Sequence, residues 1–100
     1  MYEKNIYDEI RDYEEIRKIR KLFTAVLLLA IKDAYQSRSI SLKLKKQAGC
    51  FLRGNEDLKA VCYMADVDET KIKEIAKEKK FKNKEKYYKI KSILRKNMIL

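Results

Sequence analysis

The chain of 100 residues contains no proline and only two glycines, Gly49 and Gly54. Tight β-turns depend on these two residue types, so a fold built from many short strands is disfavoured. A glycine-lined phosphate loop is excluded for the same reason. Lysine, glutamate, leucine, isoleucine and alanine dominate the composition, which favours helix. The sequence therefore predicts an all-α protein, with four to five helices in a compact bundle that forms a single domain over residues 1–100.

The most apolar segment is the ten-residue run from Leu22 to Ile31. Ten residues are too few to span a bilayer, and the acidic segment before the run is unlike a signal peptide. We expect this run to form the central core helix of a cytoplasmic protein without membrane partners. Cys50 and Cys62 lie among apolar neighbours, which predicts two buried, reduced thiols and agrees with a cytoplasmic location.

A long first helix is predicted from about Tyr2 to Tyr35. Apolar residues recur in it at spacings of three and four: Ile6, Ile10, Tyr13, Ile16, Ile19, Phe23, Val26 and Ala30. Such a helix would be about 50 Å long, which exceeds the size of a domain this small. Either it breaks between Arg17 and Lys21, or its first half, within residues 1–20, projects from the body. A projecting half with an apolar stripe would form a homodimer through this helix, whereas a broken one would fold back on its own core.

Capping residues predict the remaining helices, over residues 41–53, 56–64, 68–79 and 85–97. Gly54 suits the left-handed conformation that ends a helix, while Asn55 and Asp68 suit N-caps. The expected buried residues of the first of these helices are Leu42, Leu44, Ala48, Phe51 and Leu52. The last helix, which lies in a basic segment over 79–100, places Tyr87, Ile90, Leu94 and Met98 on one stripe.

Residues 58–77 have the pattern of a helix-turn-helix. Apolar residues fall where two short crossing helices need them, at Val61, Ala65, Val67, Ile72 and Ile75. The second helix of such a unit can enter a major groove, although any two packed helices with a short turn have a similar pattern. The acidic start of this second helix argues against simple groove reading, because it would point toward phosphates.

The formal net charge of +10 is concentrated in residues 21–54 and 79–100. An excess of this size indicates an anionic partner, such as a nucleic acid or an acidic protein. Phe81, Tyr87 and Tyr88 lie between the lysines of the second block, as in surfaces that stack on bases. The alternative is that the lysines form only a solvated face. The predicted nucleic-acid-binding residues are Thr70, Lys71, Lys73, Lys77, Lys80, Lys82, Lys84, Lys86, Lys89 and Arg95.

Enzymatic signatures are poor in this chain. It contains no histidine, which is the commonest general base and metal ligand. It also lacks a nucleophile elbow and a P-loop. Asp66, Asp68 and Glu69 cluster at a turn, but helix capping explains them better than a metal site does. We therefore expect no catalytic residues, no metal and no cofactor, and we expect that the protein is not an enzyme.

The segment from Leu42 to Asp68 resembles part of a widespread group of small, mostly uncharacterised phage and prophage proteins. The residues that carry the resemblance are Ala48, Phe51, Leu52, Val61, Cys62, Ala65, Val67 and Asp68. The chain departs from that group at Asp66, where glycine is common, and at Glu69, where proline is frequent. The resemblance implies an origin in a mobile element more than it implies a mechanism.

Two functions follow from these observations. The first is a small, basic DNA-binding regulatory protein of phage type, in which lysines hold phosphates. The alternative is a phage-encoded inhibitor of a host defence nuclease, similar in action to an anti-CRISPR protein, that acts by protein–protein binding. The predicted partner is accordingly DNA or a nucleic-acid-binding host protein complex.

Overall fold

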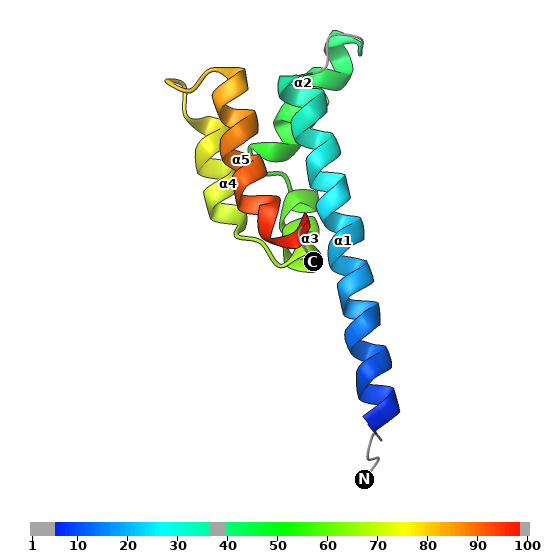
Figure 1. Cartoon of the computed structure of the whole chain (residues 1–100). Coiled ribbons are helices and arrows are strands. Elements are labelled where there is room, and N and C mark those ends of the chain that lie inside the picture. Colours follow the sequence, from blue (N-terminus) through cyan, green and yellow to red (C-terminus); the bar gives the residue numbers. More distant parts are fainter. Residues whose placement is uncertain (1–5, 37–39, 99–100) are drawn as a thin grey trace.

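The computed structural model describes residues 6–36 and 40–98, with side chains from Asp12 onward. Five helices follow one another along the chain: α1 (Ile6–Tyr35), α2 (Leu42–Leu52), α3 (Glu56–Ala65), α4 (Glu69–Lys77) and α5 (Asn83–Met98). No strand occurs among the described residues, so the predicted all-α fold with four to five helices is confirmed. Figure 1 shows α4 and α5 on one side of the body and the long α1 on the other.

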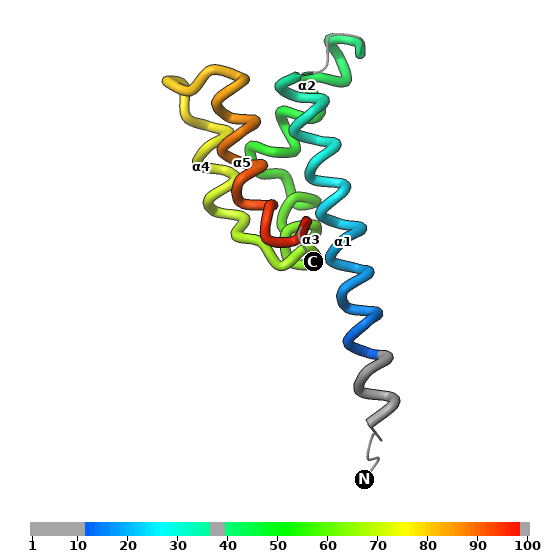
Figure 2. The backbone as a smooth tube through the Cα atoms, in the orientation of Figure 1, coloured from blue at the N-terminus to red at the C-terminus, as the bar shows by residue number. Residues whose placement is uncertain are grey.

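Helix α1 is one unbroken helix of 30 residues, so of the two alternatives the break between Arg17 and Lys21 is wrong. Helices α2, α3 and α5 all pack against α1. Figure 2 shows that they cover its second half, while the described part of the first half extends beyond the body. The side chains from Tyr13 to Ile19 are exposed accordingly. Two residues of the predicted apolar stripe, Ile6 and Ile10, lie outside the described side chains.

Side-chain caps determine where three of the helices begin. Ser41 Oγ accepts a hydrogen bond from the Leu44 amide at 3.3 Å, before α2. The carboxamide of Asn55 accepts from the Leu58 amide at 3.2 Å, before α3. The Asp68 carboxylate accepts from the Thr70 amide at 2.9 Å, before α4. The predicted caps at Asn55 and Asp68 are confirmed, and each satisfies an amide that a helix start leaves without a partner.

Residues with positive φ end two helices. Gly54 follows α2 with φ of 115°, in agreement with its predicted role. Asp66 follows α3 with φ of 57° and ψ of 49°, in the left-handed region that favours glycine. The amides of Asp66 and Val67 donate to the carbonyl oxygens of Tyr63 at 3.2 Å and Cys62 at 3.0 Å. This pair of bonds is the Schellman motif, which turns the chain sharply from α3 into α4.

All five helices contribute residues to the core. The projecting part of α1 contributes none among the described side chains. The buried hydrophobic residues are Leu27, Ile31, Leu52, Leu58, Cys62, Ala65, Ile72, Ala76, Ile90 and Leu94. The run from Leu22 to Ile31 therefore supplies the centre of the core through Leu27 and Ile31, as predicted. Only one face of the run is buried, however, because Leu22, Val26 and Leu29 are exposed.

Several predicted buried positions are exposed. Helix α2 faces the core with Gly49 and Leu52, and Leu42 lies two turns before Gly49, beyond the core. Leu44 points to a neighbouring, uncovered side. Cys50 is exposed because consecutive helical residues point about 100° apart, so apolar sequence neighbours do not imply burial.

The predicted stripe of α5 is confirmed at its centre, where Ile90 and Leu94 are buried and Tyr87 is half-buried. Met98, at the end of the stripe, is exposed, whereas the neighbouring Asn97 is buried. The side-chain amide of Asn97 donates to acceptors on α1 and α3, and position 97 shares the buried face of α5 with Ile90 and Leu94.

Candidate nucleic-acid interface

The hairpin of α4 and α5 carries the densest positive charge of the molecule. Between Lys77 and Lys96 the chain has ten basic residues and two acidic ones. Helices α4 and α5 lie side by side, so this charge is gathered on one part of the body. Such a concentration destabilises the folded state by self-repulsion unless an anion or salt offsets it.

Four side chains form a stripe along one side of α5. Lys84, Tyr88, Lys91 and Arg95 are spaced by four, three and four residues, so they share this side; Lys91 is half-buried and the other three are exposed. Ile90 and Leu94, about 100° around the helix from Lys91 and Arg95, are buried in the core and hold the helix in this orientation. The stripe is roughly 16 Å long at 1.5 Å per residue, long enough to follow several phosphates of a duplex.

Aromatic rings position two further lysines beside the stripe. Lys89 Nζ lies 4.6 Å from the centre of the Phe81 ring, and Lys80 Nζ lies 5.6 Å from it. Phe81 belongs to the connection between α4 and α5, and its side chain is half-buried. Tyr88 packs edge-to-face on Tyr87, with 5.2 Å between ring centres, and is exposed. Cation–π contacts of this kind reduce the number of positions that a lysine side chain samples.

Helix α4 presents a mixed face to solvent. Its exposed side chains are Thr70, Lys71, Glu74 and Lys77, while Ile72 and Ala76 are buried. Glu74 lies in the middle of this face and opposes phosphate approach. The N-terminus of α4 is also acidic, because Asp68 and Glu69 begin it. The α3–α4 unit has the predicted helix-turn-helix order, but its second helix is a poor reader of a phosphate-lined groove.

Lys73 is not available on the face of α4. Its ammonium pairs with the Glu69 carboxylate at 2.9 Å, one turn earlier in the same helix. Its aliphatic chain crosses Gly54, where an added Cβ atom would come within 2.5 Å of Lys73 Cδ. Lys73 therefore fastens α4 to the turn between α2 and α3.

Lys86 also has a structural contact. Its Nζ donates to the carbonyl oxygen of Ala76 at 2.8 Å, near the C-terminus of α4. The carbonyl groups at a helix C-terminus lack intrahelical partners and carry partial negative charge, so a lysine there is stabilising. The contact ties the start of α5 to the end of α4.

The structure thus divides the ten predicted contact residues into two groups. Those with exposed side chains are Thr70, Lys71, Lys77, Lys80, Lys82, Lys84, Lys89 and Arg95. Lys73 and Lys86 are half-buried and make the internal contacts described above. Lys91 and Tyr88 complete the α5 stripe; neither is among these ten residues, although the sequence placed both in the basic, aromatic C-terminal segment. The spacing of Lys84, Lys91 and Arg95 by seven and four residues is the signal in the sequence that identifies Lys91.

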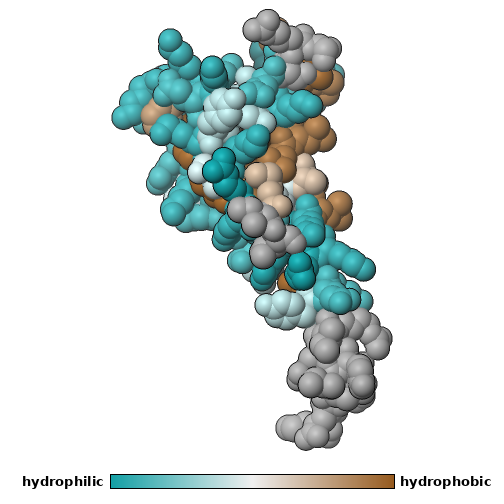
Figure 3. All heavy atoms as spheres, in the orientation of Figure 1, coloured by the Kyte–Doolittle hydropathy of each residue, from teal (hydrophilic) through white to brown (hydrophobic). Residues whose placement is uncertain are grey.

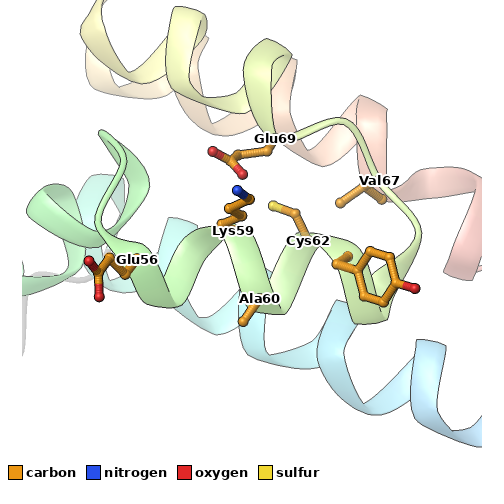
Figure 4. Close-up of a pocket in the computed structure, with 7 residues that line it drawn as sticks. Glu56, Lys59, Ala60, Cys62, Val67 and Glu69 are labelled. Carbon is orange, nitrogen blue, oxygen red and sulfur yellow. The ribbon is translucent and has the colours of Figure 1, made fainter.

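A shallow groove lies between α3 and the start of α4, with a volume of about 520 Å³. It is lined by Glu56, Lys59, Ala60, Cys62, Tyr63, Val67 and Glu69. Figure 4 shows the Cys62 sulfur, the Lys59 amine and the Glu69 carboxylate directed toward the same space. The pKa of the Cys62 thiol is raised to about 11, mainly by burial and in addition by the negative charges of Glu69 and Asp68. A neutral thiol is a poor nucleophile, so the groove lacks an activated group.

Comparisons of the chain with protein-family models, curated proteins and solved structures found no match. The resemblance to small phage proteins accordingly stays a prediction. Within residues 6–36 and 40–98, no helix combines the length and apolar character needed to cross a membrane. The same residues bring together no group of three or more acidic or cysteine side chains that could hold a metal ion.

Proposed function

We propose that the protein binds nucleic acid through the positively charged surface of α5 and of the connection between α4 and α5. The observation that carries the proposal is the excess of ten basic over two acidic residues between Lys77 and Lys96. Apart from Lys86, no cation of this segment donates to a protein oxygen in the described structure, and none forms an ion pair there. Cations without a carboxylate partner are free to displace counterions from a phosphate backbone.

In this proposal α5 contacts phosphates and α4 has a lesser part. The stripe of Lys84, Lys91 and Arg95 supplies charges along one line, and Tyr88 supplies an exposed ring between them. On α4, Glu74 and the acidic N-terminus weaken contact with a groove, so base reading by Lys71 or Lys77 contributes less. Binding is then mostly independent of base sequence, because phosphate contacts position a protein without specifying bases.

The cellular role that we propose is that of a small DNA-binding regulatory protein of phage type. Two observations support this role: the basic surface, and the resemblance of residues 42–68 to small phage proteins. A protein of this size with broad affinity for duplex DNA can alter access to promoters or to replication origins without catalysis.

Fluorescence anisotropy tests the proposal with labelled duplex and single-stranded DNA at roughly 50 and 200 mM salt, the range in which phosphate contacts show their slope. We expect the wild-type affinity to fall steeply with salt. The Lys91→Ala and Arg95→Ala variants should each reduce the slope of log K against log salt by about 1. Lys43→Ala is the matched control for Arg95→Ala, because both side chains are exposed but Lys43 lies on α2. Absent binding at the lower salt concentration, or an equal effect of the control, would overturn the proposal.

A second candidate function is inhibition of a host defence nuclease by protein–protein binding. The observation that favours it is a groove of about 460 Å³ between α1 and the α3–α4 turn, lined mainly by apolar side chains that include Ile16, Ile19 and Met64. Tyr63 lines the same groove with 84% of its surface exposed. Exposed tyrosines beside apolar residues are typical centres of protein interfaces.

The second candidate makes different predictions from the first. The protein would reduce the activity of the target nuclease, and Tyr63→Ala would abolish this effect while the α5 variants would retain it. Affinity for free DNA would be weak. Loss of inhibition in Arg95→Ala but not in Tyr63→Ala would contradict this candidate and favour competition for nucleic acid.

A further inference from the structure

The side of α1 that faces away from the body is apolar in its middle part. Ile19, Leu22, Val26 and Leu29 are 38%, 61%, 39% and 59% exposed, respectively. No charged residue occurs between Leu22 and Ile31, although 40% of the whole chain is charged. Figure 3 shows hydrophobic atoms gathered along this edge of the molecule. A free helix face is normally polar, so the composition of this one indicates that another surface covers it.

The spacing of the four residues identifies the kind of surface that fits. Ile19, Leu22, Val26 and Leu29 are separated by three, four and three residues, which corresponds to positions a, d, a and d of a heptad repeat. The two a positions hold β-branched residues and the two d positions hold leucine. Among parallel coiled coils, this combination favours two helices over higher assemblies. The stripe is therefore suited to an identical stripe on a second copy of the chain.

The position of the stripe allows two copies to meet. Leu27 and Ile31 of α1 are buried by the body, which packs on the other side of the helix. A second copy thus approaches α1 without collision with α2, α3 or α5.

We propose that Ile19, Leu22, Val26 and Leu29 form the interface of a parallel, in-register homodimer. In this arrangement each of the four residues meets its own copy across a two-fold axis that runs along α1. The interface lies in the middle of α1 and differs from the sequence-based expectation, which placed dimer contacts on the projecting first half. The proposal does not rest on nucleic-acid binding, and its test contains no nucleic acid.

Sedimentation velocity of the full chain, at concentrations from roughly 5 to 500 μM, measures the association. We expect wild-type protein to show the mass of a dimer in the upper part of this range. Leu22→Glu and Leu29→Glu should each shift the dissociation constant at least tenfold toward monomer. Both leucines are exposed in the single chain, so the far-UV circular dichroism of the variants should match that of the wild type.

Leu42→Glu is the matched control, because it makes the same substitution at a leucine on α2 that is 67% exposed, against 61% for Leu22. It should leave the dimer intact. Wild-type protein that remains monomeric at the highest concentration overturns the proposal. So does a dimer that Leu42→Glu dissociates and Leu22→Glu does not, because that result assigns the interface to α2.

Cysteine cross-linking tests the parallel orientation separately. Leu22→Cys and Leu29→Cys are introduced one at a time in a Cys50→Ser background, which removes the exposed native thiol. In a parallel, in-register pair both positions bring two Cα atoms within disulfide range, so both variants should form a covalent dimer on mild oxidation. In an antiparallel pair at most one position can lie on the axis. Cross-linking at only one position, or at neither, therefore overturns the parallel arrangement.

Discussion

Substitution of Asn97 tests whether a buried amide joins three helices of this protein. Asn97 Nδ2 donates to the carbonyl oxygen of Ala65 at 2.6 Å, at the end of α3, and to Thr24 Oγ1 at 3.0 Å, in α1. Asn97 and Thr24 are both buried. The Thr24 hydroxyl donates in turn to the carbonyl oxygen of Arg20 at 2.6 Å, which leaves it able to accept from Asn97. The network therefore connects α1, α3 and α5 through a single side chain.

The expected loss of unfolding free energy follows from the polar groups that lose their hydrogen-bond partners. Asn97→Leu keeps a similar volume but removes two hydrogen bonds, each of which contributes about 1 kcal/mol net. It also leaves the Ala65 carbonyl without this buried donor, which adds about 1 kcal/mol or more. We expect the free energy of unfolding to fall by about 2–4 kcal/mol, out of the 5–15 kcal/mol that is usual for a domain. Thr24→Val removes only one of the two acceptors and should cost about 1 kcal/mol.

The Asn97→Asp variant provides a pH-dependent test of the same network. A carboxylate there would face two acceptors in a buried site, so its pKa in the folded state would rise above the usual value of about 3.9. A raised pKa in an acid means that folding favours the protonated form. The variant is then least destabilised below about pH 4, and the loss grows as the pH rises through the folded-state pKa.

Urea unfolding of wild type and variants, followed by far-UV circular dichroism at about pH 4 and 7, measures both effects. A double-mutant cycle between Asn97→Leu and Thr24→Val should show coupling of about 0.5–3 kcal/mol, because the two side chains are in contact. The reasoning is refuted if Asn97→Leu costs less than about 0.5 kcal/mol, which is the size of an ordinary surface change. It is also refuted if the loss in Asn97→Asp is the same at both pH values.

Three further predictions concern single positions. Asp66→Gly should stabilise the protein by about 0.5–1 kcal/mol in urea unfolding, because glycine adopts the left-handed region at φ of 57° without strain; an unchanged midpoint would contradict this. Gly54→Ala should destabilise it by about 1–3 kcal/mol, because φ is 115° and the new methyl group displaces Lys73 from its pair with Glu69; a neutral effect in the same assay would show that the turn adapts. Iodoacetamide at about pH 8 should modify the exposed Cys50 and spare the buried Cys62. The pKa of Cys62 is raised to about 11, so its labelling should increase only as the pH approaches that value. Equal modification of both cysteines at pH 8, measured by mass spectrometry, would refute the burial of Cys62.

Much of the secondary structure is predictable from local features. Asn55 and Asp68 mark helix starts because their side chains satisfy amides only two or three residues away. Gly54 marks a helix end for a comparable local reason. Of the two alternatives for α1, the break was wrong because it rested on the size of a compact domain. The segment from Arg17 to Lys21 contains no helix breaker, so nothing local interrupts the hydrogen bonds.

Burial was harder to predict than helix formation. Leu42 and Leu44 are of a residue type that is usually buried, yet both are exposed because α2 meets the core only at its later turns. Asn97 is of a residue type that is usually exposed, yet it is buried because hydrogen-bond acceptors from α1 and α3 lie beside it. The acceptors of Asn97 lie 32 and 73 positions away in the chain, and no local pattern includes them.

The candidate interface shows the same division. The density of lysines near the C-terminus is evident in the sequence, and so is the resulting prediction of an anionic partner. Which lysines are available is not evident. Lys73 and Lys86 make internal contacts because folding brings Glu69, Gly54 and the Ala76 carbonyl beside them, whereas Lys84 and Arg95 meet nothing comparable.

By itself, the sequence determined that this protein is helical, where its helices begin and end to within a few residues, and that it is strongly basic. These properties depend on residue type, on short-range hydrogen bonds and on charge, all of which act locally or add up without regard to the fold. The tertiary structure decided which lysines face solvent and which apolar face of α1 is covered by the body. Helical periodicity shows which residues share a face, but only the packing of the other helices determines which face has a neighbour.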